Sequence, residues 1–279
     1  MKTPGIVRIT RPLNSVVAGL AAVLAFLIAT GTVTLASLIL IPIVTLITAA
    51  GNVVNDIYDI GIDKINRPER PLPSGETRLG TAKIFAALLF ITGITICTFT
   101  NPLCLVIAIF NSAILILYAS NFKKTMFLGN VAVSYLSASI FLFGGAFSGI
   151  EGLIANFSIT GITFLAMMAR EVLKDAEDID GDAAAGGRTL PIAFGIQKSS
   201  FIAIFFAVFA IIASILPVLR WGIWYIAGIA IADIVILTGA LRPFRCHTSA
   251  CVRNTCATTY IKVGMFVALG VFTFSALVF

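Results

Sequence analysis

Charged side chains are scarce in this 279-residue chain. Aspartate, glutamate, lysine and arginine make up 11% of the residues and hydrophobic residues 59%, and the mean hydropathy is +1.04. This composition excludes an ordinary soluble domain and indicates an integral membrane protein. Strand-like alternation of polar and apolar residues is also absent. Because helices satisfy their own backbone in lipid, we expect an all-α fold.

Histidine and cysteine are also scarce, and their spacing predicts neither a zinc site nor a disulfide framework. The chain has one histidine and five cysteines. Cys97 and Cys104 flank a short loop and could approach each other. Cys246, Cys251 and Cys256 share a loop with the histidine, but their spacing of five does not match the usual zinc pattern. We therefore expect no disulfide framework, and the second loop is best interpreted as a tolerated polar loop.

Long apolar runs are what the sequence does contain. A segment of about 20 apolar residues crosses a hydrocarbon core of about 30 Å, and such segments recur along the chain, separated by loops too short for a soluble domain. We predict one transmembrane domain over residues 1–279. Its nine expected spans are 13–31, 36–58, 80–98, 102–120, 127–147, 153–173, 199–219, 222–241 and 260–279.

Basic residues predict how these spans are oriented. Eighteen of the 19 lysines and arginines fall on one side of the nine spans, and Arg220 is the exception. By the positive-inside rule, the N-terminus and the long loops are cytoplasmic and the C-terminus lies outside. The expected location is the cell membrane, with several spans. The net charge of +6 then favours anionic lipid or a phosphorylated substrate over nucleic acid as the partner.

Two segments, 52–63 and 171–182, repeat one acidic pattern at the end of an apolar run. In each, an amide or acid is followed by aspartates four, seven and eleven residues later, which places all of them on one face of a helix. Carboxylates so close to a bilayer require a cation, and all-oxygen ligands favour magnesium over zinc. The candidate metal ligands are Asn52, Asp56, Asp59, Asp63, Glu171, Asp175, Asp178 and Asp182.

Each acidic segment continues into a loop (59–79 and 175–198) that contains an arginine, then Leu-Pro, then glycine. Such a duplication typically places the site of a membrane protein between its halves, so we expect two facing acidic clusters. Guanidinium and ammonium groups beside them would bind phosphate oxygens. The candidates for diphosphate are Arg67, Arg70, Lys123, Lys174 and Arg188, and those for other parts of a substrate are Arg11, Asn14 and Tyr118.

One further acid lies deep in an apolar run. Asp233 is about twelve residues into the expected span 222–241. An acid at this depth is either functional or a hydrogen-bonding contact between helices. The sequence leaves both interpretations open.

The acidic segments resemble those of a known family. Asn55-Asp56-x-x-Asp59-x-x-x-Asp63, with Arg70-Pro-Leu-Pro-Ser-Gly75 and a second aspartate-rich motif, resembles the UbiA superfamily of intramembrane prenyltransferases. Within it, the segment 63–71 and the second motif, followed by Thr189-Leu-Pro191, are similar to the archaeal digeranylgeranylglyceryl phosphate synthases.

The resemblance implies a magnesium-dependent prenyl transfer with no obligatory protein partner. Geranylgeranyl diphosphate would be the donor and geranylgeranylglyceryl phosphate the acceptor, in the synthesis of membrane ether lipids. Magnesium would join the diphosphate to the carboxylates, and Asp56, Asp59, Asp175 and Asp178 would be the catalytic ones. Two alternatives stay open: a prenyltransferase with an aromatic acceptor, such as a quinone precursor or a chlorophyllide-like molecule, and, from a different class, a divalent-cation transporter.

Overall fold

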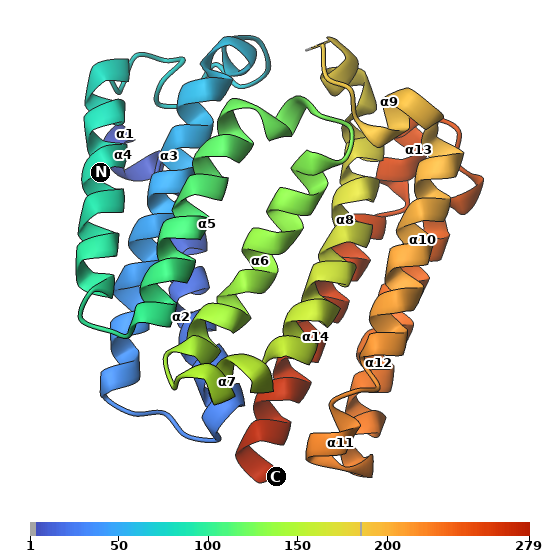
Figure 1. The fold of residues 1–279 in the computed structure, drawn as a ribbon. Helices are drawn as coiled ribbons and strands as arrows, with labels where there is room; N and C mark the ends of the chain where they lie inside the picture. Colours follow the sequence, from blue (N-terminus) through green and yellow to red (C-terminus); the bar gives the residue numbers. More distant parts are fainter. Residues whose placement is uncertain (1–3, 185) are drawn as a thin grey trace. The chain divides into compact units, whose positions relative to one another are not determined.

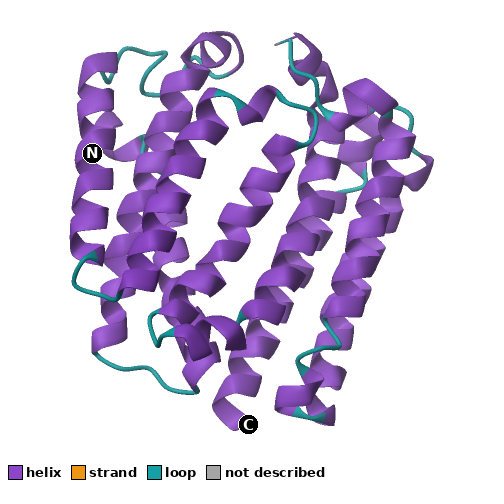
Figure 2. Cartoon of the chain, viewed as in Figure 1, coloured by secondary structure: helices purple, strands orange, loops and turns teal. Residues whose placement is uncertain are grey.

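The computed structural model describes residues 4–184 and 186–279. Over these residues every element is a helix and every connection a loop or turn (Figure 2). This confirms the expected all-α class. The chain forms two compact units, which are described separately below. Unit 1 is Met1–Asn121 with Ile140–Ile154, and unit 2 is Phe122–Ser139 with Ala155–Phe279.

Unit 1 contains the first acidic segment. Neighbouring long helices run side by side in Figure 1, α3 against α2, α4 and α5. Small residues allow this packing: a β-carbon at Gly19 of α2 would lie 2.6 Å from the carbonyl oxygen of Ile41. The helices are α1 (Gly5–Arg8), α2 (Pro12–Thr30), η1 (Ala36–Ile39), α3 (Leu40–Asn66), α4 (Leu79–Cys97), α5 (Pro102–Ser120) and most of α7 (Ile150–Ala155).

Local sequence determines where these helices begin and end. Pro12 is the first residue of α2, where its missing N–H costs no hydrogen bond, and Gly31 ends that helix with a φ of 73°. The side chain of Asn101 accepts a hydrogen bond from the Cys104 N–H at the start of α5. Apolar side chains of α2, α3, α4 and α5 then form the core of unit 1.

Unit 2 contains the second acidic segment. Figure 1 shows α8 beside α10 and α12 beside α14. Fully buried alanines, such as Ala203 and Ala240, line the core between these helices, because small side chains let helix backbones approach closely. The elements are η2 (Phe122–Lys124), α8 (Phe157–Ala184), α9 (Leu190–Phe194), α10 (Ile196–Ala213), α11 (Val218–Trp221), α12 (Ile223–Leu241), η3 (Arg242–Arg245), α13 (Ser249–Asn254) and α14 (Ala257–Val278); α6 (Leu128–Ala146) belongs to unit 2 up to Ser139 and to unit 1 beyond it.

Eight helical segments in the described part of the chain are long and apolar enough to cross a membrane. They correspond to all the expected spans except 153–173, which falls on α7 and α8. The helix α8 continues through the second acidic segment to Ala184; its charged residues keep it out of this set, and the count of nine stays a prediction. Likewise, α3 continues past the expected end at residue 58 to Asn66. Both acidic segments therefore lie on helices that extend beyond their apolar parts.

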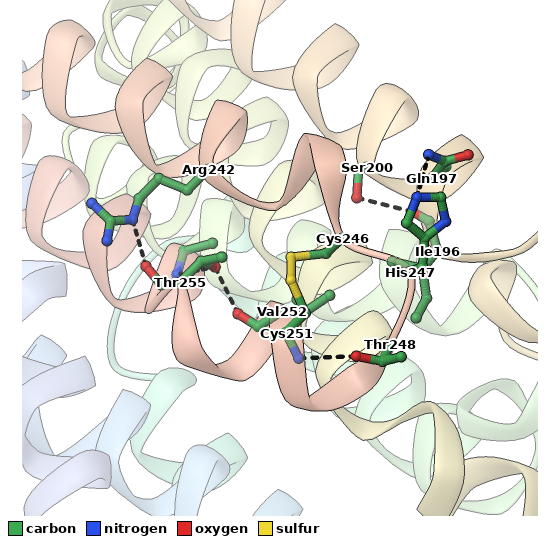
Figure 3. Close-up of a disulfide and its surroundings, with 11 residues drawn as sticks. Ile196, Gln197, Ser200, Arg242, Cys246, His247, Thr248, Cys251, Val252 and Thr255 are labelled. Carbon is green, nitrogen blue, oxygen red and sulfur yellow. Dashed lines mark hydrogen bonds between the residues drawn. A yellow bond between two sulfur atoms is a disulfide. The ribbon is translucent and has the colours of Figure 1, made fainter.

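The loop interpreted as a tolerated polar loop contains a disulfide that was not predicted. Cys246 and Cys251 are joined, with 5.5 Å between their α-carbons (Figure 3). The chain turns between them because the Thr248 hydroxyl accepts the Cys251 N–H and starts α13. Cys97 and Cys104, the pair that flanks the short loop, are free and buried. Spacing alone did not reveal the turn that brings the two sulfurs of the other loop together.

Candidate functional site

The three aspartates of the first acidic segment lie on one face of α3. Their residues are only 5–7% exposed, with Asp56 and Asp63 at 5% and Asp59 at 7%. The helical spacing predicted this common face, and the structure confirms it. Buried carboxylates require partners, because an isolated charge loses its hydration without compensation.

Two arginines are those partners. Nη2 of Arg11 lies 2.6 Å from Oδ1 of Asp56. Nη1 of Arg70 lies 2.6 Å from Oδ2 of Asp63 and 3.5 Å from the same Asp56 oxygen. The amide of Asn55 donates to Oδ2 of Asp59 at 2.8 Å. The first segment is thus a compact cluster of carboxylates and guanidinium groups, drawn from α3, the α1–α2 connection and the loop after α3.

Arg11 occupies an uncommon backbone conformation. Its φ of 49° is in the left-handed region, which non-glycine residues rarely adopt. The amide nitrogen of Asn52 holds this connection, because it donates to the Thr10 carbonyl at 3.1 Å and to the Ser15 hydroxyl at 3.2 Å. Only the carbonyl oxygen of Asn52 is therefore available as a metal ligand, and its nitrogen positions the turn that carries Arg11.

The second segment places Glu171, Asp175, Asp178 and Asp182 on one face of α8. Glu171 is buried and lies between two cations, forming an ion pair with Arg170 and one with Lys174, whose Nζ is 3.8 Å away. Asp178 is exposed, and it has no ion pair in the part of the chain that the structure describes. Among the described residues, Arg170 and Lys174 both pair with Glu171, whereas the arginines of the α3 cluster pair with two different aspartates.

Asn130 is a site residue that was not predicted from the sequence. Its buried amide, on α6, donates to Oδ2 of Asp175 at 2.9 Å. Burial raises the pKa of the Asp175 carboxyl to about 7, although the hydrogen bond from Asn130 acts in the opposite direction. An amide near the start of an apolar run was the only available signal, and it did not say which acid the amide would contact.

The last aspartate of the segment also favours a cation. Burial and the neighbouring Asp178 carboxylate raise the pKa of Asp182, whereas Lys123 and Lys174 lower it. The N–H of Gly187 returns to the carbonyl of Asp182 at 2.8 Å and closes the end of α8. A divalent ion would relieve the repulsion between these two carboxylates.

The remaining acids of α8 point elsewhere. Glu177 accepts a hydrogen bond from Thr258 of α14 at 2.9 Å. Asp180 accepts one from Ser249 of α13, with Arg253 at 3.7 Å. These two acids fasten α8 to its neighbours, so they serve as controls for the motif face.

Other predicted residues are more dispersed. Arg67 follows α3 and Arg188 follows α8, and both are exposed; Asn14 is exposed near the start of α2, Tyr118 is half-buried near the end of α5, and Lys123 is exposed in η2. Asp233 lies apart from both acidic segments, on α12, where it accepts a hydrogen bond from Ser214 at 2.7 Å. This is the contact between neighbouring elements that the sequence left open as one interpretation.

The donor atoms of both segments fit magnesium better than a softer metal. They are carboxylate oxygens, with an amide oxygen at Asn52. Among residues 4–184 and 186–279, no three histidine, cysteine, aspartate or glutamate side chains converge to hold a metal by themselves. Magnesium does not require such a cage, since it keeps several waters and is commonly bound jointly by one or two carboxylates and substrate phosphates.

Comparison with known proteins decides the family. Residues 15–272 match the model of the UbiA prenyltransferase family. The chain belongs to this family. It is 56% identical to the digeranylgeranylglyceryl phosphate synthase of Methanoculleus marisnigri over 279 residues, which is the full length of both chains. As a family member with several apolar helices, it is an integral multi-pass membrane protein.

Solved structures of UbiA proteins have the same fold. A structure from work on digeranylgeranylglyceryl phosphate synthase in membranes superimposes with a TM-score of 0.86, at 34% identity and with 98% of each chain covered. A UbiA homolog from Archaeoglobus fulgidus, bound to GPP and Mg²⁺, superimposes with a TM-score of 0.71 at 15% identity. The superposition covers 95% of this chain and 99% of that one.

Proposed function

We propose that this chain transfers a geranylgeranyl group from geranylgeranyl diphosphate to the free hydroxyl of geranylgeranylglyceryl phosphate. The products are digeranylgeranylglyceryl phosphate and pyrophosphate. The observation that carries the proposal is 56% identity, over the full length, to a relative named for this product. The geometry is consistent with it, because two acidic helix faces bordered by basic residues suit a magnesium diphosphate.

The residues of the two segments have distinct tasks in this reaction. Basic groups would bind the diphosphate oxygens, and carboxylates would hold magnesium, which neutralises the charge that develops on the leaving diphosphate. Arg11 and Arg70 already lie at the carboxylates of α3, and Lys174 lies beside those of α8. The proposed magnesium ligands are Asp56, Asp59, Asp63, Asp175, Asp178 and Asp182. Glu171 lies at the apolar end of the second segment, and Asn52, at that of the first, positions the turn that carries Arg11.

The chemical step breaks one carbon–oxygen bond and makes another. The allylic C–O bond of the donor breaks, and its electron pair leaves with pyrophosphate. The acceptor hydroxyl attacks the allylic carbon and forms the ether, and its proton passes to a carboxylate or to pyrophosphate. Because an allylic cation is a strong electrophile, the chain has no need of a strong base. Its residues orient the diphosphate and stabilise its negative charge.

The acceptor carries its own phosphate, which gives the further basic residues a second task. We assign Lys123, Arg67 and Arg188, which are exposed around the ends of the motif helices, to the two phosphate-bearing substrates. Asn14 and Tyr118 would contact the rest of a substrate. An aromatic acceptor needs no such excess of positive charge, and this difference favours the lipid acceptor.

The expected membrane arrangement belongs to this proposal. With α8 as the ninth span, the N-terminus and both acidic segments face the cytoplasm and the C-terminus lies outside, because eighteen of the 19 basic residues then share the cytoplasmic side. Both units would act as one domain in this reaction.

The test offers two acceptors in competition. Purified protein in lipid nanodiscs receives radiolabelled geranylgeranyl diphosphate and magnesium, with equal concentrations of geranylgeranylglyceryl phosphate and 4-hydroxybenzoate. Label in the glycerol phosphate alone supports the proposal. Label in the aromatic acid would retain the donor chemistry and overturn the assigned acceptor.

A further inference from the structure

A pocket of about 540 Å³ lies in unit 2, apart from the acidic segments. It is lined by Gln197, Lys198 and Phe201 of α10, by Phe244 and Arg245 of η3, and by His247. None of these residues belongs to either acidic motif, although Gln197 and Lys198 end the segment 175–198 that follows the second one. The reaction proposed above assigns no task to this pocket.

The pocket is cationic. Lys198 and Arg245 line it, no carboxylate does, and neither cation forms an ion pair within the described part of the chain. The imidazole of His247 forms a hydrogen bond with the Gln197 amide, 3.2 Å from Nε2 to Nε2 (Figure 3). Two basic groups without acidic partners in one hollow indicate an anionic ligand.

One wall of the pocket is the beginning of α10. Gln197 and Lys198 lie in its first turn, where backbone N–H groups lack helical acceptors and the helix dipole favours an anion. Phe201 lies four residues after Gln197 and three after Lys198, so it is on the same face of the helix and about 5 Å further along it. The polar wall thus changes to an apolar one toward the interior of a candidate span.

The opposite wall is held by the disulfide. Cys246 separates Arg245 from His247 in sequence, and only 3% of it is exposed. Its bond to Cys251 fixes this residue to α13 (Figure 3). The two polar side chains of this wall therefore flank an anchored residue, which restricts how far they can move from Lys198.

We propose that this pocket binds the phosphate headgroup of an anionic membrane lipid. Lys198 and Arg245 bind the phosphate oxygens, Gln197 and His247 supply hydrogen bonds, and a lipid chain lies along the two phenylalanines. These are exposed, Phe201 at 64% and Phe244 at 48%, as a surface covered by a lipid chain requires. Basic pockets at the ends of transmembrane helices are suited to such headgroups.

The experiment measures lipid binding to the full chain in detergent micelles. Dioleoyl phosphatidylglycerol, dioleoyl phosphatidylcholine and glycerol 3-phosphate are titrated separately, and the bound ligand is counted by native mass spectrometry. We expect phosphatidylglycerol to bind at least about tenfold more tightly than the other two, since each basic residue contributes to attraction of an anionic lipid. Equal binding of glycerol 3-phosphate would make a free phosphate the ligand and overturn the lipid assignment.

Matched variants locate the binding. The double variant Lys198→Gln/Arg245→Gln should lose about tenfold or more in phosphatidylglycerol affinity. The control Arg78→Gln/Lys83→Gln removes the same charge from exposed positions of unit 1 and should bind as the unaltered chain does. An equal loss of affinity in both double variants would mean that binding depends on overall charge, and it would overturn the proposed site.

A third variant tests the apolar wall. Phe201→Ala should weaken phosphatidylglycerol binding, and its thermal unfolding midpoint should stay unchanged because the ring is exposed. Prenyl transfer is assayed in all variants as a separate readout. A raised KM for the prenyl acceptor with unchanged phosphatidylglycerol binding would make the pocket part of the catalytic site and overturn the proposal.

Discussion

Arg11 and Arg70 share one oxygen of Asp56. Nη2 of Arg11 lies 2.6 Å from Oδ1, and Nη1 of Arg70 lies 3.5 Å from the same atom. Each guanidinium group carries five N–H donors, so both arginines have donors left for the oxygens of a further anion. If a diphosphate binds here, its oxygens take over hydrogen bonds that Asp56 accepts now, and the carboxylate turns to the accompanying cation.

Arg11→Gln should therefore weaken diphosphate binding. We expect kcat/KM for geranylgeranyl diphosphate to fall by about tenfold to a hundredfold, because one charge-assisted contact is lost. Steady-state kinetics at varied donor concentration measure this. Arg8→Gln is the control, since Arg8 pairs with the exposed Glu76 instead. Equal loss in both variants would refute a specific role for Arg11.

Two matched variants on different faces of α8 test whether the motif face is the functional one. Asp178→Asn changes the motif face, and Asp180→Asn makes the same chemical change on the face held by Ser249. We expect the first to lower kcat/KM by about a hundredfold or more and the second by less than about threefold. Radiolabelled product formation measures both. An equal effect would mean that overall acidity, and not the motif face, matters.

Asn52 should act through the turn that carries Arg11. Asn52→Ala removes the donor to Thr10 and Ser15, so Arg11 should lose its position and the kinetic defect should resemble that of Arg11→Gln. The double variant should then be no worse than either single one. Independent, multiplying defects would show that Asn52 acts separately, as a metal ligand does.

The raised pKa values of two carboxyls on α8 predict how stability and magnesium binding depend on pH. Burial raises the pKa of Asp175 to about 7 and that of Asp182 above its ordinary value, whereas an unfolded aspartate titrates near 3.9. A carboxyl with a raised pKa contributes to the free energy of unfolding. This contribution is fully present below about pH 4 and is lost as the pH rises through about 7. Metal-free protein should lose thermal stability over this interval.

Magnesium should reverse that loss, because it binds the ionised carboxylates. Thermal unfolding in detergent, with magnesium or with chelator, should show a stabilisation that grows between about pH 5 and pH 8. Asp175→Asn should reduce this growth. A magnesium effect that is constant over the same pH range would contradict the assignment of these carboxylates as ligands.

The cysteines give a prediction independent of catalysis. Without reductant, maleimide should label Cys256, which is free and exposed, and spare Cys97 and Cys104, which are buried. After reduction, maleimide should also label Cys251, which is exposed once its disulfide is opened. Peptide mapping by mass spectrometry distinguishes these sites. Labelling of Cys251 before reduction would contradict the disulfide.

Periodicity carried most of what the sequence could predict. Aspartates at helical spacing predicted the common faces of α3 and α8, because intervals of four, seven and eleven residues return to one side of any helix. The apolar runs likewise predicted most of the long helices. Their ends were less predictable: charged residues continue both motif helices past their apolar parts, so α3 and α8 are longer than the runs suggested.

Contacts distant in sequence were beyond such reasoning. Asn130 is 45 residues from Asp175, and Arg11 is 45 from Asp56. No local pattern pairs these residues. The Cys246–Cys251 bond was missed for a different reason, because it depends on a turn that the Thr248 hydroxyl forms. The sequence thus indicated which acids matter and left their partners to the structure.

The identity of the product tests the central claim most directly. Purified chain in nanodiscs is given geranylgeranyl diphosphate, geranylgeranylglyceryl phosphate and magnesium, and the lipid extract is analysed by mass spectrometry. We predict a glycerol phosphate with two geranylgeranyl ethers, together with pyrophosphate, and neither in the Asp56→Asn/Asp175→Asn variant. Formation of the same product by that variant, or of no diether by the unaltered chain, would contradict the account.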